Sequence, residues 1–203
     1  RRLMIRTTIA SLAVLALAAT PAAADAPVGA KAPAFTGLAS DGTTVSLADY
    51  AGETVILEWT NHGCPYVKKV YNGGVMQDLQ AAAAEQDVVW LTIISSAPGK
   101  QGHVRADEAN ELSETRGANP AKVILDPKGK IGRAYGAVTT PHMFVIDPEG
   151  VVQYAGAIDD RPTSDPASLE GATNYVRLAM NHMAAGEPVE VAQTQPYGCS
   201  VKY

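Results

Sequence analysis

A β-branched and aromatic run, Thr54 to Thr60, ends at the turn Asn61-His62-Gly63, and Cys64-Pro65 then opens a helical pattern. The run contains no glycine or proline, which is typical of a buried strand. Pro65 suits the first turn of a helix because the N–H that proline lacks needs no partner there. The chain is therefore expected to pass from a buried strand directly into a helix whose N-terminus carries Cys64.

Strand and helix patterns alternate along the rest of the chain. Asp41-Gly42 before Thr43 indicates a hairpin turn. Further strands are predicted at residues 88–95, 123–125, 143–146 and 151–155, and helices at 65–86 with a break at 72–74, 103–116, 131–136 and 168–185. This order predicts an α/β fold, with a central mixed β-sheet flanked by helices and an N-terminal β-hairpin.

The first residues have a different character. Three arginines among the first six residues precede the apolar run Ile9 to Ala19, and Ala22-Ala23-Ala24 follows. This pattern is typical of a secretory signal, and the run is shorter than the roughly 20 apolar residues that span a bilayer. We expect a signal peptide at 1–24, one domain at 25–186, and a tail at 187–203. The protein would then be exported, periplasmic or secreted, with no stable membrane association after cleavage.

Composition and charge restrict the partners. With 46% hydrophobic and 18% charged residues, the chain is expected to fold. It has 16 basic and 21 acidic residues, and cleavage after Ala24 would remove three of the basic ones. An acidic protein repels phosphate backbones and anionic lipids, which argues against nucleic-acid binding. Small molecules and proteins remain as partners, and the sequence indicates no cofactor.

The two cysteines, Cys64 and Cys199, are the candidates for chemistry. A thiol at a helix N-terminus faces unpaired backbone N–H groups and the positive end of the helix dipole, which favour the thiolate. We therefore expect Cys64 to be exposed and anionic. His62, two residues before it, and Lys68 and Lys69, one turn after it, would add positive charge if their side chains point toward the sulfur.

Longer motifs carry a family resemblance. The strand, turn and Cys64-Pro65, followed by Tyr135–Pro141 and Phe144–Asp147, resemble the thioredoxin-like redoxin superfamily, which includes alkyl hydroperoxide reductases and thiol-specific antioxidants. Trp59–Lys68 and Gly198–Lys202 are similar to its peroxiredoxin-like branch. The resemblance covers about residues 27 to 203. It implies a thioredoxin-like fold and an oxidoreductase, either a thiol peroxidase or a thiol-disulfide oxidoreductase.

The resemblance also implies roles for particular residues. Cys64 corresponds to the attacking cysteine, and Thr140-Pro141 to a loop whose cis proline lies beside it. That loop would expose the backbone of Thr140 for pairing with an extended peptide or a partner thiol. The expected catalytic residues are Cys64, Cys199, Thr60 and Pro141, and the expected surroundings of the thiolate are Asn61, His62, Pro65, Lys68, Thr140, His142 and Arg161.

The sequence departs from the patterns of the superfamily at three places. Val67 stands where a thioredoxin-type pair has its second cysteine, so no local dithiol exists. Asn61 stands where the peroxiredoxin pattern usually has threonine, with Thr60 one residue earlier. Pro141 lies where that pattern would have arginine, which makes Arg161 the best remaining arginine. These departures count against efficient peroxide catalysis.

Cys199 is the obvious resolving thiol. A sulfenic acid on Cys64 would condense with a nearby thiol to a disulfide before over-oxidation. In this scheme a hydroperoxide or a disulfide is the substrate, and an external thioredoxin-like protein is the reductant. Two alternatives for Cys199 stay open, namely a structural disulfide and a bridge between the two chains of a homodimer.

Two other functions also stay open. Cys64, His62 and His142 would suit copper or zinc if they converged, and copper chaperones share this fold. The chain would then be a metal-binding module and not an enzyme. The third hypothesis is a non-catalytic thioredoxin-like interaction domain.

Overall fold

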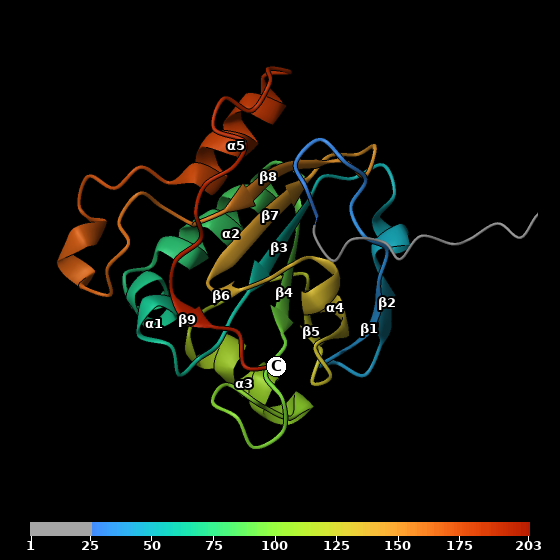
Figure 1. Ribbon diagram of the computed structural model, residues 1–203, viewed down its shortest axis with the longest axis vertical. Helices are drawn as coiled ribbons and strands as arrows, with labels where there is room; N and C mark the ends of the chain where they lie inside the picture. Colours follow the sequence, from blue (N-terminus) through green and yellow to red (C-terminus); the bar gives the residue numbers. More distant parts are fainter. Residues whose placement is uncertain (1–25) are drawn as a thin grey trace, which may run out of the picture.

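The computed structural model describes residues 26–203, so the predicted signal segment, residues 1–24, lies outside the described residues. Seven strands of the described chain form one sheet in the order β2-β1-β5-β4-β3-β7-β8 (Figure 1). The strands are β1 (Thr36–Ala39), β2 (Thr44–Ser46), β3 (Val55–Trp59), β4 (Val89–Ile94), β5 (Lys122–Leu125), β7 (His142–Ile146) and β8 (Val152–Gly156). Strands β3, β4 and β5 are parallel and the others pair antiparallel. The predicted mixed sheet is confirmed, as is the N-terminal hairpin of β1 and β2.

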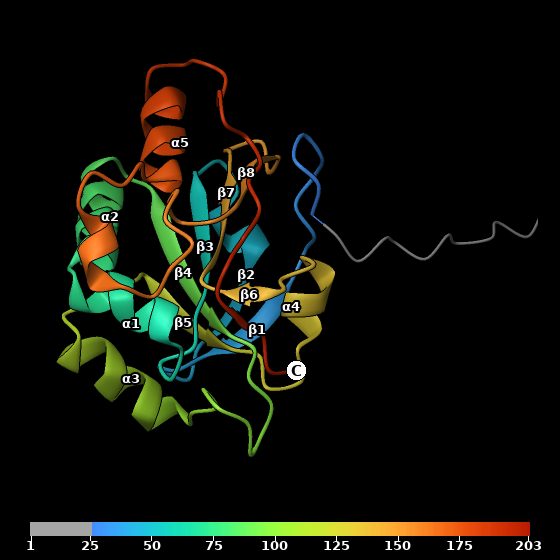
Figure 2. The ribbon, with the colours of Figure 1, turned by 60° about the vertical axis from the view of Figure 1, so that its left-hand side comes forward.

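Helices cover both faces of the sheet (Figure 2). On one face, α1 (Pro65–Asn72), α2 (Val75–Glu85) and α5 (Tyr175–Ala184) pack on Ile56, Trp90 and Val145. Helix α3 (Ala106–Thr115) contacts β4 and β5 through Ala109. On the other face, α4 (Lys130–Ala134) packs on Leu57, Ile93 and Phe144. Successive strand residues alternate between these two cores, as the period of two requires.

The predicted break in the first helix is confirmed. Helix α1 ends at Asn72, and Gly74, with φ of +76°, precedes α2. A left-handed backbone of this kind is easily adopted by glycine. The break lets α2 change direction while the N-terminus of α1 stays at the end of β3.

The predicted final helix is wrong in its first half. Residues Pro166–Leu169 form a short 3₁₀ helix, and α5 begins only at Tyr175. Gly171 between them has φ of +66° and ends the first turn. The Asn174 side chain then accepts a hydrogen bond from the N–H of Arg177 and starts a new helix. Apolar spacing alone could not reveal this interruption. No helix among residues 26–203 is both long and apolar enough to cross a membrane.

The predicted tail is not a free end. After α5 the chain runs back along β8, where the N–H of Ala155 donates to Ala192 O. It then forms β9 (Cys199–Ser200), which pairs antiparallel with β6 (Thr139–Thr140) in a separate two-stranded sheet. Figure 1 shows this red segment descending from α5 to the side of β6. The last residues of the chain therefore lie against the loop that precedes β7.

Candidate active site

Cys64 is the N-cap residue of α1, as the sequence predicts. Its N–H donates to Asn61 O at 3.0 Å, and its carbonyl accepts the first helical hydrogen bond from Lys68 N at 2.9 Å. The Asn61 side chain accepts from Gly63 N at 2.9 Å and so closes the turn. Asn61 thus shapes the turn that presents the cysteine.

The prediction that Cys64 is exposed is wrong. Its accessible surface is 0%, and it belongs to the core between the sheet and α1. Tyr66 of the helix packs there, together with Tyr197 and Cys199 of the C-terminal segment. The sequence could not show this burial because Tyr197 and Cys199 come from the far end of the chain.

The Thr140-Pro141 loop lies beside the thiol, and its peptide bond is cis. Cys64 Sγ donates a hydrogen bond to Thr140 O at 3.2 Å. Thr140 is also the β-pairing partner of Cys199, so the register brings the second cysteine to the first. Both cysteines are free thiols in this structure. The prediction that the backbone of Thr140 is open for an extended peptide is therefore wrong for this structure. That backbone is already paired with Cys199 of the same chain.

The two thiols are electrostatically unequal. Burial opposes ionisation of Cys64, but hydrogen bonds from the Cys199 thiol and from the N–H groups of Val67 and Cys199 outweigh it and hold the pKa of Cys64 below its ordinary value. Burial and then the neighbouring Cys64 raise the pKa of Cys199 to about 11. Of the two thiols, Cys64 therefore loses its proton more readily, and Cys199 keeps its proton to higher pH.

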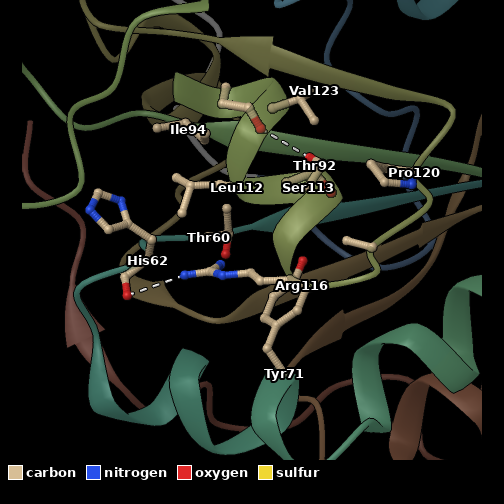
Figure 3. A pocket seen from close by; sticks show the side chains of 12 residues that line it. Thr60, His62, Tyr71, Thr92, Ile94, Leu112, Ser113, Arg116, Pro120 and Val123 are labelled. Carbon is tan, nitrogen blue, oxygen red and sulfur yellow. Dashed lines mark hydrogen bonds between the residues drawn. The ribbon is translucent and has the colours of Figure 1, made fainter. Parts of the chain in front are cut away.

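Thr60 and His62 lie around a small cavity at the end of β3 (Figure 3). Arg116 lines the same cavity and donates to His62 O at 3.3 Å. Burial and the charge of Arg116 lower the pKa of His62. Among the described residues, the hydrogen-bond partners of the Cys64 sulfur include neither the Thr60 hydroxyl nor the His62 ring.

The other predicted neighbours of the thiolate lie mostly away from it. Pro65 and Lys68 are exposed on α1. The Arg161 guanidinium donates to Gly171 O at 3.1 Å and pairs with Asp160 at 3.4 Å. The Lys68 side chain is thus exposed, the Arg161 guanidinium binds Gly171 and Asp160, and neither is among the hydrogen-bond partners of the sulfur.

His142 is buried next to the cis-proline loop, where its ring lies 4.6 Å from that of Phe144. Its Nδ1 accepts from Val138 N at 3.4 Å. Within residues 26–203, no group of three or more His, Cys, Asp or Glu side chains is arranged to hold a metal ion. The structure therefore does not assemble the predicted metal set of Cys64, His62 and His142.

Acid is expected to destabilise the protein through His142. Burial lowers the pKa of His142 to about 4, whereas an unfolded histidine titrates near pH 6.5. Below about pH 6.5 the unfolded chain binds the proton more tightly, so the free energy of unfolding falls by about 3 kcal/mol as the pH drops to about 4. Urea unfolding at several pH values across this range measures how the free energy of unfolding depends on pH. The variant His142→Asn should be less pH-dependent than the wild type, and an unchanged slope would contradict the assignment.

Sequence reasoning missed a buried polar cluster behind the cysteines. Lys69 Nζ lies 3.4 Å from Asp159 Oδ2, with both side chains buried, and donates to Tyr197 OH at 3.1 Å and to Arg161 O at 2.9 Å. The Tyr197 hydroxyl donates to the other oxygen of Asp159. Lys69 lies next to the cysteine motif, but its partners Asp159 and Tyr197 lie about 90 and 128 positions away in the sequence. No local signal connects them.

A second buried carboxylate, Glu58, was also missed because it lies within the apolar run of β3. Its oxygens accept from the side chains of Tyr71, Trp90 and Thr92 at distances of 2.8 to 3.1 Å. Burial raises the pKa of Glu58, and the three donors oppose that shift. This network ties α1 to β3 and β4 below the cysteine turn.

The fold and the site define a thioredoxin-like redoxin, with a cysteine at a helix N-terminus and a cis proline beside it. The chain belongs to the AhpC/TSA family, whose model matches residues 28–155. A search of curated protein sequences found no match.

Solved structures show the same fold. An uncharacterised protein from Geobacillus kaustophilus has 25% identity and a TM-score of 0.76, over 88% of this chain and 93% of that one. A hypothetical protein from Sinorhizobium meliloti has 21% identity and a TM-score of 0.76, over 87% and 94%. A Chlorobium tepidum protein assigned as a thiol:disulfide interchange protein, DsbE, has 26% identity and a TM-score of 0.52, over 64% and 84%. This chain has the thioredoxin-like fold of thiol-disulfide oxidoreductases.

Proposed function

We propose that the protein is a thiol-disulfide oxidoreductase in which Cys64 attacks the substrate and Cys199 resolves the product. The observation that carries this proposal is the β6–β9 register, which sets Cys199 opposite Thr140 while Cys64 bonds to the Thr140 carbonyl. Val67 occupies the place of a local second cysteine, and Cys199 supplies the missing thiol from the C-terminal segment. The protein is thus proposed to use a dithiol assembled from two distant parts of the chain.

The reaction follows from the unequal thiols. The Cys64 thiolate attacks one sulfur of a substrate disulfide, forms a mixed disulfide, and releases the other sulfur as a thiolate. That thiolate takes up the Cys199 proton, and Cys199 then attacks Cys64 Sγ. The second substrate thiolate leaves, and the Cys64–Cys199 disulfide remains. The substrate gains two electrons and the protein loses two, which an external thioredoxin-like dithiol protein would restore.

Peroxide reduction is a second candidate, which the AhpC/TSA match favours. In that case Cys64 would become a sulfenic acid, and Cys199 would condense with it and release water. The surroundings of the sulfur count against efficient peroxide chemistry. No arginine of the described chain is among the groups that lower the pKa of Cys64, and neither is the Thr60 hydroxyl.

The oxidant can be identified by comparing disulfide formation with two reagents. Reduced protein is mixed with oxidised glutathione or with hydrogen peroxide, quenched by acid, and analysed by mass spectrometry. We expect the Cys64–Cys199 disulfide to form faster with oxidised glutathione than with hydrogen peroxide, because neither an arginine nor the Thr60 hydroxyl is among the groups that act on the Cys64 sulfur. Faster formation with peroxide would favour the second candidate. If neither reagent joins the cysteines, the proposal fails.

We further propose that the protein works outside the cytoplasm, in the periplasm or as a secreted protein. Arg1, Arg2, the apolar run Ile9–Ala19 and the small residues before Asp25 support export. The compartment suits the chemistry, since exported dithiols meet oxidised partners. Detection of a mature chain that begins near Asp25 in a periplasmic extract would test this proposal.

A further inference from the structure

The C-terminal residues 194–203, here called the strap, are held to the body at both ends and in the middle. At one end, Thr194 Oγ1 accepts from Ala157 N at 2.9 Å. In the middle, the Cys199–Ser200 strand pairs with β6, and Val201 N donates to Val138 O at 3.0 Å. At the other end, Lys202 O accepts from Ala97 N at 2.8 Å, and the ring of Tyr203 lies 4.3 Å from the Arg133 guanidinium carbon. Figure 2 shows the strap in red, running down past β6.

The strap covers the strand and the sulfur that the proposed reaction uses. It pairs with the backbone of Thr139 and Thr140, which is the strand next to the reactive sulfur. Its Tyr197 and Cys199 pack on the cluster that contains Cys64, whose accessible surface is 0%. A sulfur without accessible surface cannot attack an external disulfide. The strap must therefore leave, at least in part, before Cys64 reacts with a partner.

The buried cluster of Lys69, Asp159 and Tyr197, here called the latch, holds the strap in place. The Tyr197 hydroxyl is bonded both to the ammonium of Lys69 and to the carboxylate of Asp159, and its ring packs edge-on against Tyr66 with centroids 5.8 Å apart. Hydrogen bonds to charged groups are stronger than neutral ones. Tyr197 is two residues before Cys199 in the sequence, so the latch also sets the position of the second thiol.

Gly198 allows the strap to lie unusually close to β6. Its φ is +140°, and a Cβ at this position would lie 2.1 Å from the carbonyl oxygen of Thr140. That oxygen belongs to the backbone and is the same atom that accepts from Cys64. Any larger residue at this position would push the strap away from the cysteine.

We propose that the strap is an internal stand-in for the substrate strand, and that opening of the latch uncovers Cys64 and the β6 edge for an extended polypeptide carrying a disulfide. This inference rests on the proposed function. It adds a substrate class, and it adds a gate, by which we mean the strap that covers Cys64 until the latch opens. The covalent steps are those given above, with the substrate cysteine taking the place of Cys199. Backbone pairing with β6 would orient the polypeptide, as strand addition does at other sheet edges.

The gate can be tested by measuring how fast iodoacetamide alkylates Cys64. All variants carry Cys199→Ser, so that one thiol reacts, and the plateau rate at alkaline pH removes differences in pKa. Tyr197→Phe keeps the ring and loses the hydroxyl, and we expect alkylation about tenfold faster because bonds to two charged groups are lost. Gly198→Ala should be faster still, because its methyl group would clash with Thr140 O.

Tyr135→Phe is the matched control. It deletes one buried tyrosine hydroxyl that donates to Pro33 O, on the other face of the sheet. Alkylation in this variant should match the Cys199→Ser parent. Wild-type rates in both strap variants, or equal acceleration by Tyr135→Phe, would overturn the gate. Since alkylation needs no substrate disulfide, this result is independent of whether the protein exchanges disulfides.

A peptide tests the β6 edge as a binding site. The peptide of residues 195–203 with serine in place of Cys199 is added at millimolar concentration to the Gly198→Ala, Cys199→Ser variant. We expect it to slow the alkylation of Cys64 several-fold, whereas a peptide of scrambled sequence does not. Absence of protection would overturn the assignment of this edge to an extended polypeptide.

Discussion

Replacing Cys64 by serine is expected to lower disulfide reduction by about a thousandfold or more, because it removes the nucleophile that starts exchange. A serine hydroxyl at this position is not ionised at neutral pH, whatever hydrogen bonds it receives. The assay follows the reduction of insulin by the protein in the presence of dithiothreitol. The fold should survive, because serine is close to cysteine in size and Thr140 O can accept from its hydroxyl as it does from the thiol.

Cys199→Ser is the matched control for this prediction, since it makes the same exchange at the other thiol. Cys64 should still attack, so one equivalent of substrate is captured as a mixed disulfide that lacks its resolving partner. Mass spectrometry of the acid-quenched protein would show this adduct on Cys64. If Cys199→Ser lost all reaction while Cys64→Ser formed an adduct, the assigned roles of the two thiols would be reversed.

Replacing Glu58 by alanine is expected to destabilise the fold by about 4 kcal/mol or more. The change leaves the donors of Tyr71, Trp90 and Thr92 without their shared acceptor, and all three lie in the core between α1 and the sheet. Each buried donor left unpaired costs about 1–3 kcal/mol. The midpoint of urea unfolding measures the loss.

Two further variants make this prediction specific. Glu53→Ala makes the same substitution at an exposed position just before β3 and should change the stability by less than about 0.5 kcal/mol. Glu58→Gln keeps one acceptor oxygen, so its stability should lie between that of Glu58→Ala and that of the wild type. A Glu58→Ala protein as stable as Glu53→Ala would show that the network contributes nothing.

Local patterns in the sequence were enough to predict most of the sheet and the position of Cys64. The run of β3 has no glycine or proline, Pro65 suits a helix start, and the hairpin turns carry Asp-Gly or Pro-Glu-Gly. These signals involve only a few neighbouring residues, so they can be recognised without knowledge of the fold. The cis bond before Pro141 was expected only from the family resemblance.

The rest of the site depends on contacts between distant parts of the chain. A strand of two residues, Cys199 and Ser200, has no periodicity to detect, and its partner lies about 59 positions earlier. The burial of Cys64 follows from that pairing, and so does the error in predicting it exposed. From the sequence alone, Lys69 would be predicted to lie on the exposed face of a helix. Only the fold shows that it is buried beside Asp159.

Because the two cysteines lie far apart in the sequence, the redox state of the protein should affect how strongly the folded chain resists unfolding. Cys64 follows the third strand of the main sheet, and Cys199 lies in the last strand of the described chain, so a bond between them would close most of the domain into one covalent ring. In the chain-entropy treatment, a ring of this size removes much of the freedom of the unfolded polypeptide. Each turnover would then alternate between a tightly cross-linked molecule and an open one, and a protease would cut the dithiol form first.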